Sequence, residues 1–90
     1  MPESTITVSN QLGLHARAAA QLVRLAGKFQ SRITLRRTDN QTTADAKSIL
    51  SVLTLAASKG VELEIEAEGA DEQAALNAVV EIFASGFGET

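Results

Sequence analysis

The segment from Val61 to Glu68 alternates strictly between apolar and acidic residues, in the order VELEIEAE. In an extended chain, successive side chains point to opposite faces, so the apolar residues share one face and the glutamates share the other. Such a pattern is typical of a strand that is buried on one side and wet on the other. It predicts a sheet that helices cover on one face only.

Other segments repeat this alternation or show a helical period. We expect further strands at residues 5–9, 32–38 and 42–44, and helices at residues 16–28, 48–57 and from Asp71 to Gly86. This order predicts an α+β fold, an open-faced β-sandwich with a four-stranded antiparallel sheet and three helices on one face (βαββαβα). With ninety residues, the chain is expected to form a single domain over residues 1–90.

Several residues mark the expected helix ends and faces. Lys59 and Gly60 are expected to stop the second helix, and Asp71 to cap the third. The predicted core stripe of the third helix consists of Leu76, Val79, Val80 and Phe83. On the wet face, Arg32 and Arg36 are candidates to neutralise the glutamates if the second and last strands are neighbours, although a solvated acidic face without function is the simpler interpretation.

Composition excludes several classes of function. The net charge is −3 and the only aromatic residues are three phenylalanines, so a nucleic-acid surface is not expected. The chain has no cysteine and one histidine, which leaves no ligand set for a metal and no redox chemistry, and we expect no cofactor. We find neither a signal peptide nor a membrane-spanning segment, and expect a cytoplasmic protein.

The one histidine, His15, lies between a glycine-containing loop and the first predicted helix. The N-terminus of a helix exposes backbone N–H groups and the positive end of the helix dipole, so it binds phosphate readily. A neutral imidazole is a nucleophile near pH 7, and Arg17 is close enough to donate to phosphate oxygens. The alternative is that His15 only caps the helix and Arg17 is solvated. Spacing alone leaves both interpretations open.

The run LGLHARAA, from Leu12 to Ala19, resembles the active-site signature of the HPr family, the histidine-containing phosphocarriers of the bacterial phosphotransferase system. The resemblance continues through residues 25–29, 46–50 and 68–71 and covers essentially the whole chain. One departure is Ala18, because most members have proline there. Proline favours the first turn of a helix, but its absence removes no chemical group.

The resemblance implies a carrier with no catalytic cycle of its own. His15 would take a phosphoryl group from phosphorylated enzyme I and pass it to an enzyme IIA-type domain. The phosphate would be on Nδ1, held by the N–H groups of Ala16 and Arg17 and by the Arg17 guanidinium. Residues 82–87 resemble the nitrogen-branch paralogue NPr, whereas residues 47–49 resemble serine-regulated HPr, so the branch stays open.

The second predicted helix is more apolar than one buried face requires, because its only polar residues are Ser48, Ser51 and Thr54. The excess can pack against other helices or dock partners. The resemblance favours docking by Ile49, Leu50 and Leu53. Basic residues that can steer acidic partners are Arg24, Lys28 and Lys47. Ser48 is both a candidate N-cap and, by resemblance, a target of an HPr kinase/phosphorylase.

Two other functions compete with the carrier. A regulatory module could bind partners through the second helix, with Ser48 as its switch. A stand-alone enzyme would need a base and an orienting group beside its nucleophile, and the sequence offers no obvious set. A carrier that presents one small face to successive partners is most simply a monomer.

Overall fold

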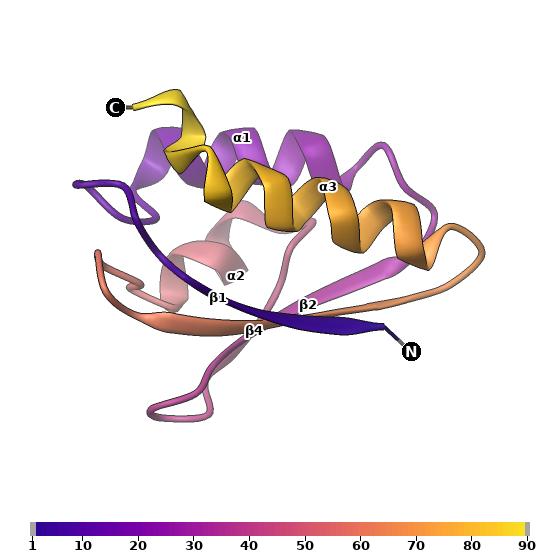
Figure 1. Ribbon diagram of the computed structural model, residues 1–90, viewed down its shortest axis with the longest axis horizontal. Coiled ribbons are helices and arrows are strands. Elements are labelled where there is room, and N and C mark those ends of the chain that lie inside the picture. Colours follow the sequence, from indigo (N-terminus) through magenta and orange to yellow (C-terminus); the bar gives the residue numbers. More distant parts are fainter. Residues whose placement is uncertain (1, 90) are drawn as a thin grey trace.

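The computed structural model describes residues 2–89, which form an antiparallel sheet with helices above one face (Figure 1). The strands are β1 (Glu3–Thr7), β2 (Arg32–Arg37), β3 (Thr43–Asp45) and β4 (Glu62–Glu68). The helices are α1 (Ala16–Ala26), α2 (Ile49–Thr54) and α3 (Glu72–Ala84), and a short 3-10 turn, η1 (Gly86–Gly88), follows. The predicted fold class and element order are confirmed.

The strictly alternating strand β4 lies inside the sheet, whose strand order is β1-β4-β2-β3. It pairs antiparallel with β1, where Leu63 lies opposite Ile6, and with β2, where Ile65 lies opposite Leu35. Leu63, Ile65 and Ala67 are fully buried beneath the helices. One continuous core therefore joins the apolar face of the sheet to the helical layer.

The wet face of the sheet carries cross-strand ion pairs, because β2 lies beside β4. Arg32 donates to Glu68 at 2.8 Å, and Arg36 donates to Glu64 at 2.7 Å. The two arginines named as candidates from the sequence thus neutralise Glu68 and Glu64. The Arg32 pair is exposed and the Arg36 pair is half-buried, so each contributes modestly to stability, and their main effect is to reduce repulsion along β4.

The second helix is shorter than predicted. α2 ends at Thr54, so Lys59 and Gly60 do not stop it. The cause is Ala56, whose φ of +48° lies in the left-handed region that an α-helix cannot contain. Arg37 donates to the carbonyl oxygens of Leu55 (2.8 Å) and Ala56 (3.3 Å) and so satisfies the groups that this early end leaves free.

Asp71 is the N-cap residue of α3, as predicted, but its side chain makes no bond to that helix, all of which the structure describes. Its carboxylate accepts from the N–H of Gln30 (3.0 Å) and from the N–H (2.9 Å) and hydroxyl (2.6 Å) of Ser31. The start of α3 is thereby tied to the start of β2. Gly69 permits this approach, because a Cβ there would lie 2.7 Å from Ser31 Cα.

The ends of α1 and α3 also differ slightly from those predicted from the sequence. α1 ends at Ala26 rather than at Lys28, and α3 ends at Ala84, with Gly86 opening the turn η1 instead of ending the helix. In the predicted stripe of α3 only Val80 is half-buried rather than buried. The buried Phe87 ring meets Phe83 edge-on, with centroids 5.0 Å apart. This contact turns the chain back toward the start of α1 (Figure 1).

None of the helices within residues 2–89 has the length and hydropathy that a membrane-spanning helix needs.

Acid should weaken the link between α3 and β2. The Ser31 hydroxyl, followed by the Gln30 N–H, holds the pKa of Asp71 below its ordinary value. A depressed pKa stabilises the fold above the unfolded-state pKa, and this contribution is lost as the pH falls through the folded-state pKa. We expect Asp71→Asn to lower the free energy of unfolding at pH 7, and its difference from the unsubstituted protein to shrink below about pH 3.9. Urea denaturation across pH measures this, and a pH-independent difference would contradict it.

Candidate functional site

A tight loop, residues 10–14, presents His15 at the start of α1. The Asn10 side chain is buried and donates from Nδ2 to the carbonyl oxygen of Gly13 at 2.8 Å. The N–H of Leu14 donates to the carbonyl oxygen of Ala57 at 2.8 Å, which fastens the loop to the segment after α2. Gly13 has φ of +65°, and a Cβ there would lie 2.5 Å from the Ala57 oxygen. Only glycine therefore fits this position.

His15 is the N-cap residue of α1. Its backbone is extended (φ −74°, ψ 179°), and its Nδ1 accepts from the N–H of Arg17 at 3.2 Å. Its carbonyl oxygen accepts from the N–H of Ala19 at 2.8 Å and opens the helical ladder. Because Nδ1 accepts a hydrogen bond, it presents its lone pair to the helix N-terminus. The ring is 27% exposed, so a partner can reach it.

Donors that suit an anion surround Nδ1. Ala16 and Arg17 form the first turn of α1, where backbone N–H groups have no acceptor within the helix. Within residues 2–89 no acceptor lies on the Ala16 N–H, and both residues are exposed. The turn therefore offers the free N–H of Ala16, the Arg17 guanidinium and the positive end of the helix dipole at one place, and the Arg17 N–H joins them when it releases Nδ1.

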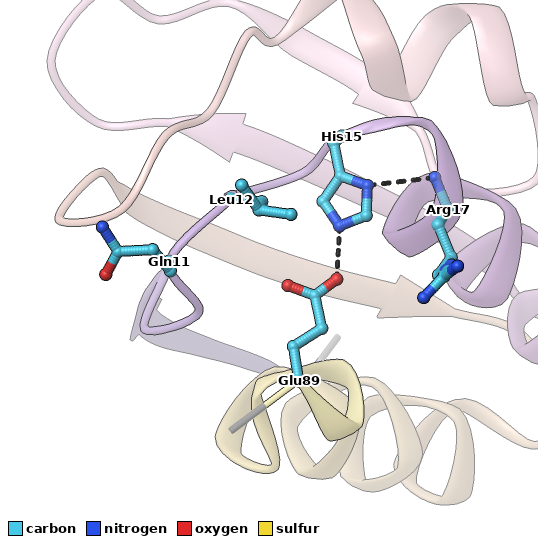
Figure 2. Close-up of a pocket in the computed structure, with 5 residues that line it drawn as sticks. All are labelled: Gln11, Leu12, His15, Arg17 and Glu89. Atoms are coloured by element: carbon cyan, nitrogen blue, oxygen red, sulfur yellow. Dashed lines mark hydrogen bonds and ion pairs between the residues drawn. The ribbon is translucent and has the colours of Figure 1, made fainter.

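Glu89 is a site residue that the sequence did not predict. Its Oε2 contacts Nε2 of His15, and its Oε1 accepts from Asn10 Nδ2 at 3.1 Å. Figure 2 shows the imidazole between this carboxylate and the Arg17 backbone nitrogen. With Nδ1 accepting, the hydrogen-bond pattern assigns the neutral-ring proton to Nε2, which donates to Glu89.

The charge of Glu89 is stabilised where it lies. The Asn10 amide first, and then the His15 ring, hold the pKa of the Glu89 carboxyl below its ordinary value, and the nearby positive charge of Arg17 adds to the effect. Glu89 is therefore an anion at neutral pH. An ionised carboxylate is a strong acceptor for the Nε2 proton.

An open recess at the surface is lined by Gln11, Leu12, His15, Arg17 and Glu89 (Figure 2). It is shallow and partly apolar, because the Leu12 side chain beside His15 is 68% exposed. In the described part of the chain no three His, Cys, Asp or Glu side chains are placed to hold a metal ion. Phosphoryl transfer needs mainly positioning and charge stabilisation, so a recess of this kind suffices for it.

Residues 2–85 match the family described as "PTS HPr component phosphorylation site". The chain belongs to the HPr family of phosphocarrier proteins. It is 45% identical over 89 residues to phosphocarrier protein HPr of Cupriavidus necator, covering 99% of this chain and 98% of that protein. It is 41% identical over 87 residues to phosphocarrier protein NPr of Escherichia coli, with 97% and 96% covered.

A solved structure agrees with the assignment to the HPr family. HPr-C-His from Thermoanaerobacter tengcongensis superposes with a TM-score of 0.94 at 41% identity, covering 100% of this chain and 99% of that one. The predicted family is confirmed, as is the prediction of a carrier rather than an enzyme. The similarity to both HPr and NPr leaves the branch undecided.

The predicted docking residues of α2 are exposed. Leu50 is 75% exposed, and Ile49 and Leu53 are partly exposed, whereas Val52 in the same helix is buried. Ser48 is the N-cap of α2, and its Oγ accepts from the N–H of Ser51 at 3.3 Å. α2 packs against α1, so this apolar surface adjoins the helix that carries the site. These exposed apolar side chains are not needed to pack α2 on the core.

The basic residues predicted to steer partners differ in exposure and in whether their charged groups are already bonded. Arg24 on α1 and Lys28, just after its end, are exposed and make no ion pair within residues 2–89. Lys47 is half-buried, and its Nζ donates to the carbonyl oxygen of Phe29 at 2.7 Å. Lys47 therefore ties the segment after α1 to the segment before α2, which the sequence did not predict.

The close packing of Gly13 in the loop of residues 10–14 should contribute to the stability of the fold. We expect Gly13→Ala to lower the free energy of unfolding by about 2–3 kcal/mol, because the added methyl group meets the Ala57 carbonyl in a left-handed backbone. Gly60→Ala is the control, since Gly60 also has a positive φ (+94°) but nothing within 4 Å of the added Cβ. Its expected cost is about 1 kcal/mol. Thermal or urea unfolding compares the two, and equal costs would contradict the packing argument.

Proposed function

We propose that this protein accepts a phosphoryl group on His15 from phosphorylated enzyme I and passes it to an enzyme IIA-type domain of the phosphoenolpyruvate-dependent phosphotransferase system. The observation that carries the proposal is the position of Nδ1, whose lone pair faces the N-terminus of α1 in an open recess. Membership of a phosphocarrier family supports it.

In the proposed step, the Arg17 N–H releases Nδ1, whose lone pair attacks the phosphorus of phosphorylated enzyme I. The bond from that phosphorus to the donor atom breaks, and its electron pair leaves with the donor atom. The Nε2 proton stays in place. The N–H groups of Ala16 and Arg17 and the Arg17 guanidinium then hold the phosphoryl oxygens. The same groups stabilise the charge again when a nucleophile of the enzyme IIA domain takes the phosphoryl group.

Partner docking is assigned to the apolar surface of Ile49, Leu50 and Leu53, extended by Leu12 at the recess. Leucines at 75% and 68% exposure favour a partner surface over a solvated one. Arg24 on α1 and Lys28 just after it, which make no ion pair within residues 2–89, add steering toward acidic partners, and Lys47 adds charge before α2.

Ser48 supports a second, regulatory proposal, in which an HPr kinase/phosphorylase modifies it. Its hydroxyl caps α2 and is half-buried at the edge of the docking surface. A phosphate there would suit the N-terminal end of the helix but would place two negative charges beside Ile49 and Leu50. It would therefore oppose docking without altering His15.

The branch of the system, the compartment and the oligomeric state belong to the same proposal. A monomer in the cytoplasm can reach enzyme I and enzyme IIA domains in turn with one small face. Both the sugar-uptake branch and the nitrogen branch use this chemistry. Transfer rates from each paralogous enzyme I distinguish them, because the cognate donor is expected to be faster.

Labelling tests the acceptor residue. Incubation with enzyme I and phosphoenolpyruvate should give an acid-labile, alkali-stable phosphoryl group on the protein, and His15→Ala should take up none. Labelled His15→Ala would contradict the assignment. A function retained by His15→Ala but lost in Leu50→Asp would favour the regulatory module instead.

Docking has its own test. We expect Leu50→Asp to raise the KM for transfer from enzyme I about tenfold or more with a smaller effect on kcat, because it places a charge in an apolar contact. Ala74→Asp is the matched control, since Ala74 is exposed near the start of α3, whereas the site residue Glu89 follows the end of that helix. Steady-state kinetics with each variant measure the effect. Equal KM values for the two variants would exclude docking at Leu50.

A further inference from the structure

We propose that Glu89 is a positioning residue that holds the Nε2 proton of His15 through the whole transfer cycle and so keeps phosphohistidine in its reactive, protonated form. This inference rests on the proposed carrier function and assigns a role to a residue beyond the active-site run. The contact between Glu89 Oε2 and His15 Nε2 carries it. The residues are 74 positions apart, so the fold alone brings them together.

The carboxylate is itself held in place. Asn10 is buried and donates from the same Nδ2 to Glu89 Oε1 (3.1 Å) and to the Gly13 carbonyl oxygen (2.8 Å). The N–H of Glu89 donates to the carbonyl oxygen of Gly86 at 3.0 Å. One amide therefore ties the loop that presents His15 to the carboxylate that contacts its ring, and Glu89 is only 15% exposed. Asn10 thus orients Glu89, and Glu89 orients the nucleophilic His15 ring, which is an arrangement expected of an active site.

Before transfer, this arrangement selects the tautomer. Nδ1 accepts from the Arg17 N–H, and Nε2 donates to Glu89, so both contacts favour the neutral ring with its proton on Nε2. The lone pair that attacks phosphorus is then always on Nδ1. A ring with the opposite tautomer would set its proton against the Arg17 N–H and its Nε2 lone pair against a carboxylate.

After transfer, the carboxylate stabilises the product cation. With the phosphoryl group on Nδ1 and the proton still on Nε2, the ring carries a positive charge, which Glu89 faces directly. When water or a partner nucleophile attacks phosphorus, the bond from Nδ1 to phosphorus breaks and its electron pair returns to Nδ1. The leaving group is the neutral Nε2–H ring. Loss of the Nε2 proton would instead make the leaving group an anion and slow transfer.

The charges around His15 come from three segments. Glu89 faces the ring from the C-terminal segment, and Arg17 faces it from α1. On the loop, the uncharged Gln11 contacts Lys59 at 3.4 Å, so this ammonium lies at the rim of the recess. Only Glu89 is negative in this set. The retention of the Nε2 proton should therefore depend on it more than on any of the others.

Hydrolysis of the isolated phosphoprotein tests this without a partner. Potassium phosphoramidate, a small phosphoryl donor, loads His15, and release of inorganic phosphate is followed across pH. The rate should fall as the pH rises and the Nε2 proton is lost. We expect Glu89→Gln, which keeps the shape and removes the charge, to move the midpoint of this fall about one pH unit lower. Glu89→Asp, which keeps the charge, should move it less.

Glu81→Gln is the control, because Glu81 is exposed on α3 and its side chain makes no bond within residues 2–89. It should leave the midpoint unchanged, and thermal unfolding confirms that each variant is folded. Equal midpoints for the unsubstituted protein and Glu89→Gln would overturn the inference. Failure of enzyme I to label the unsubstituted protein would overturn the proposed function instead, and the hydrolysis profile would still be measurable.

Discussion

Strand β4 must bury one side and leave the other in water, and the rest of the architecture accommodates this requirement. Leu63, Ile65 and Ala67 are fully buried beneath the helices, whereas the glutamates between them face solvent. A layer of helices on one face satisfies both demands at once. The positions of the helices are then constrained as well, because α3 packs on the sheet and α1 packs beside both α3 and α2. That packing brings the end of the chain to the start of α1 (Figure 1).

The site is assembled where these constraints meet. Three short segments contribute to it, namely the loop after β1, the first turn of α1 and the segment after α3. Each is fastened by backbone contacts to a more buried part, such as Leu14 to Ala57. The protein thus reaches a defined nucleophile geometry without a cavity. For a carrier this is an advantage, because both the donor and the acceptor must reach the same atom from outside.

Much of this could be predicted from sequence. Alternation and helical period were enough for the fold class and the element order, and the helix-terminus position of His15 with Arg17 was enough to suggest an anion site. The errors have local physical causes. α2 ends early because Ala56 adopts a left-handed backbone that its own sequence does not require. The Asp71 carboxylate bonds to Ser31 instead of to the N–H groups of α3, because Gly69 has no side chain and lets Ser31 come close.

Glu89 shows a different kind of limit. No spacing rule links a glutamate near residue 90 to a histidine near residue 15, and the contact depends on how η1 turns after Phe83 and Phe87 pack together. Pairings of this kind follow from the tertiary packing and carry no local pattern. Asn10 bonds to Gly13 in the loop and to Glu89 in the C-terminal segment, but nothing in the sequence distinguishes it from an ordinary loop residue.

The position of η1 has a practical consequence for handling the protein. A fluorophore, resin linker or affinity tag attached on the C-terminal side of Glu89 follows a residue that contacts the imidazole, so it can cover the recess and pull Glu89 from the ring. One joined ahead of β1 starts at the other end of the molecule (Figure 1). Immobilised or labelled forms should therefore be built at the N-terminal side if the histidine is to stay accessible to both partners.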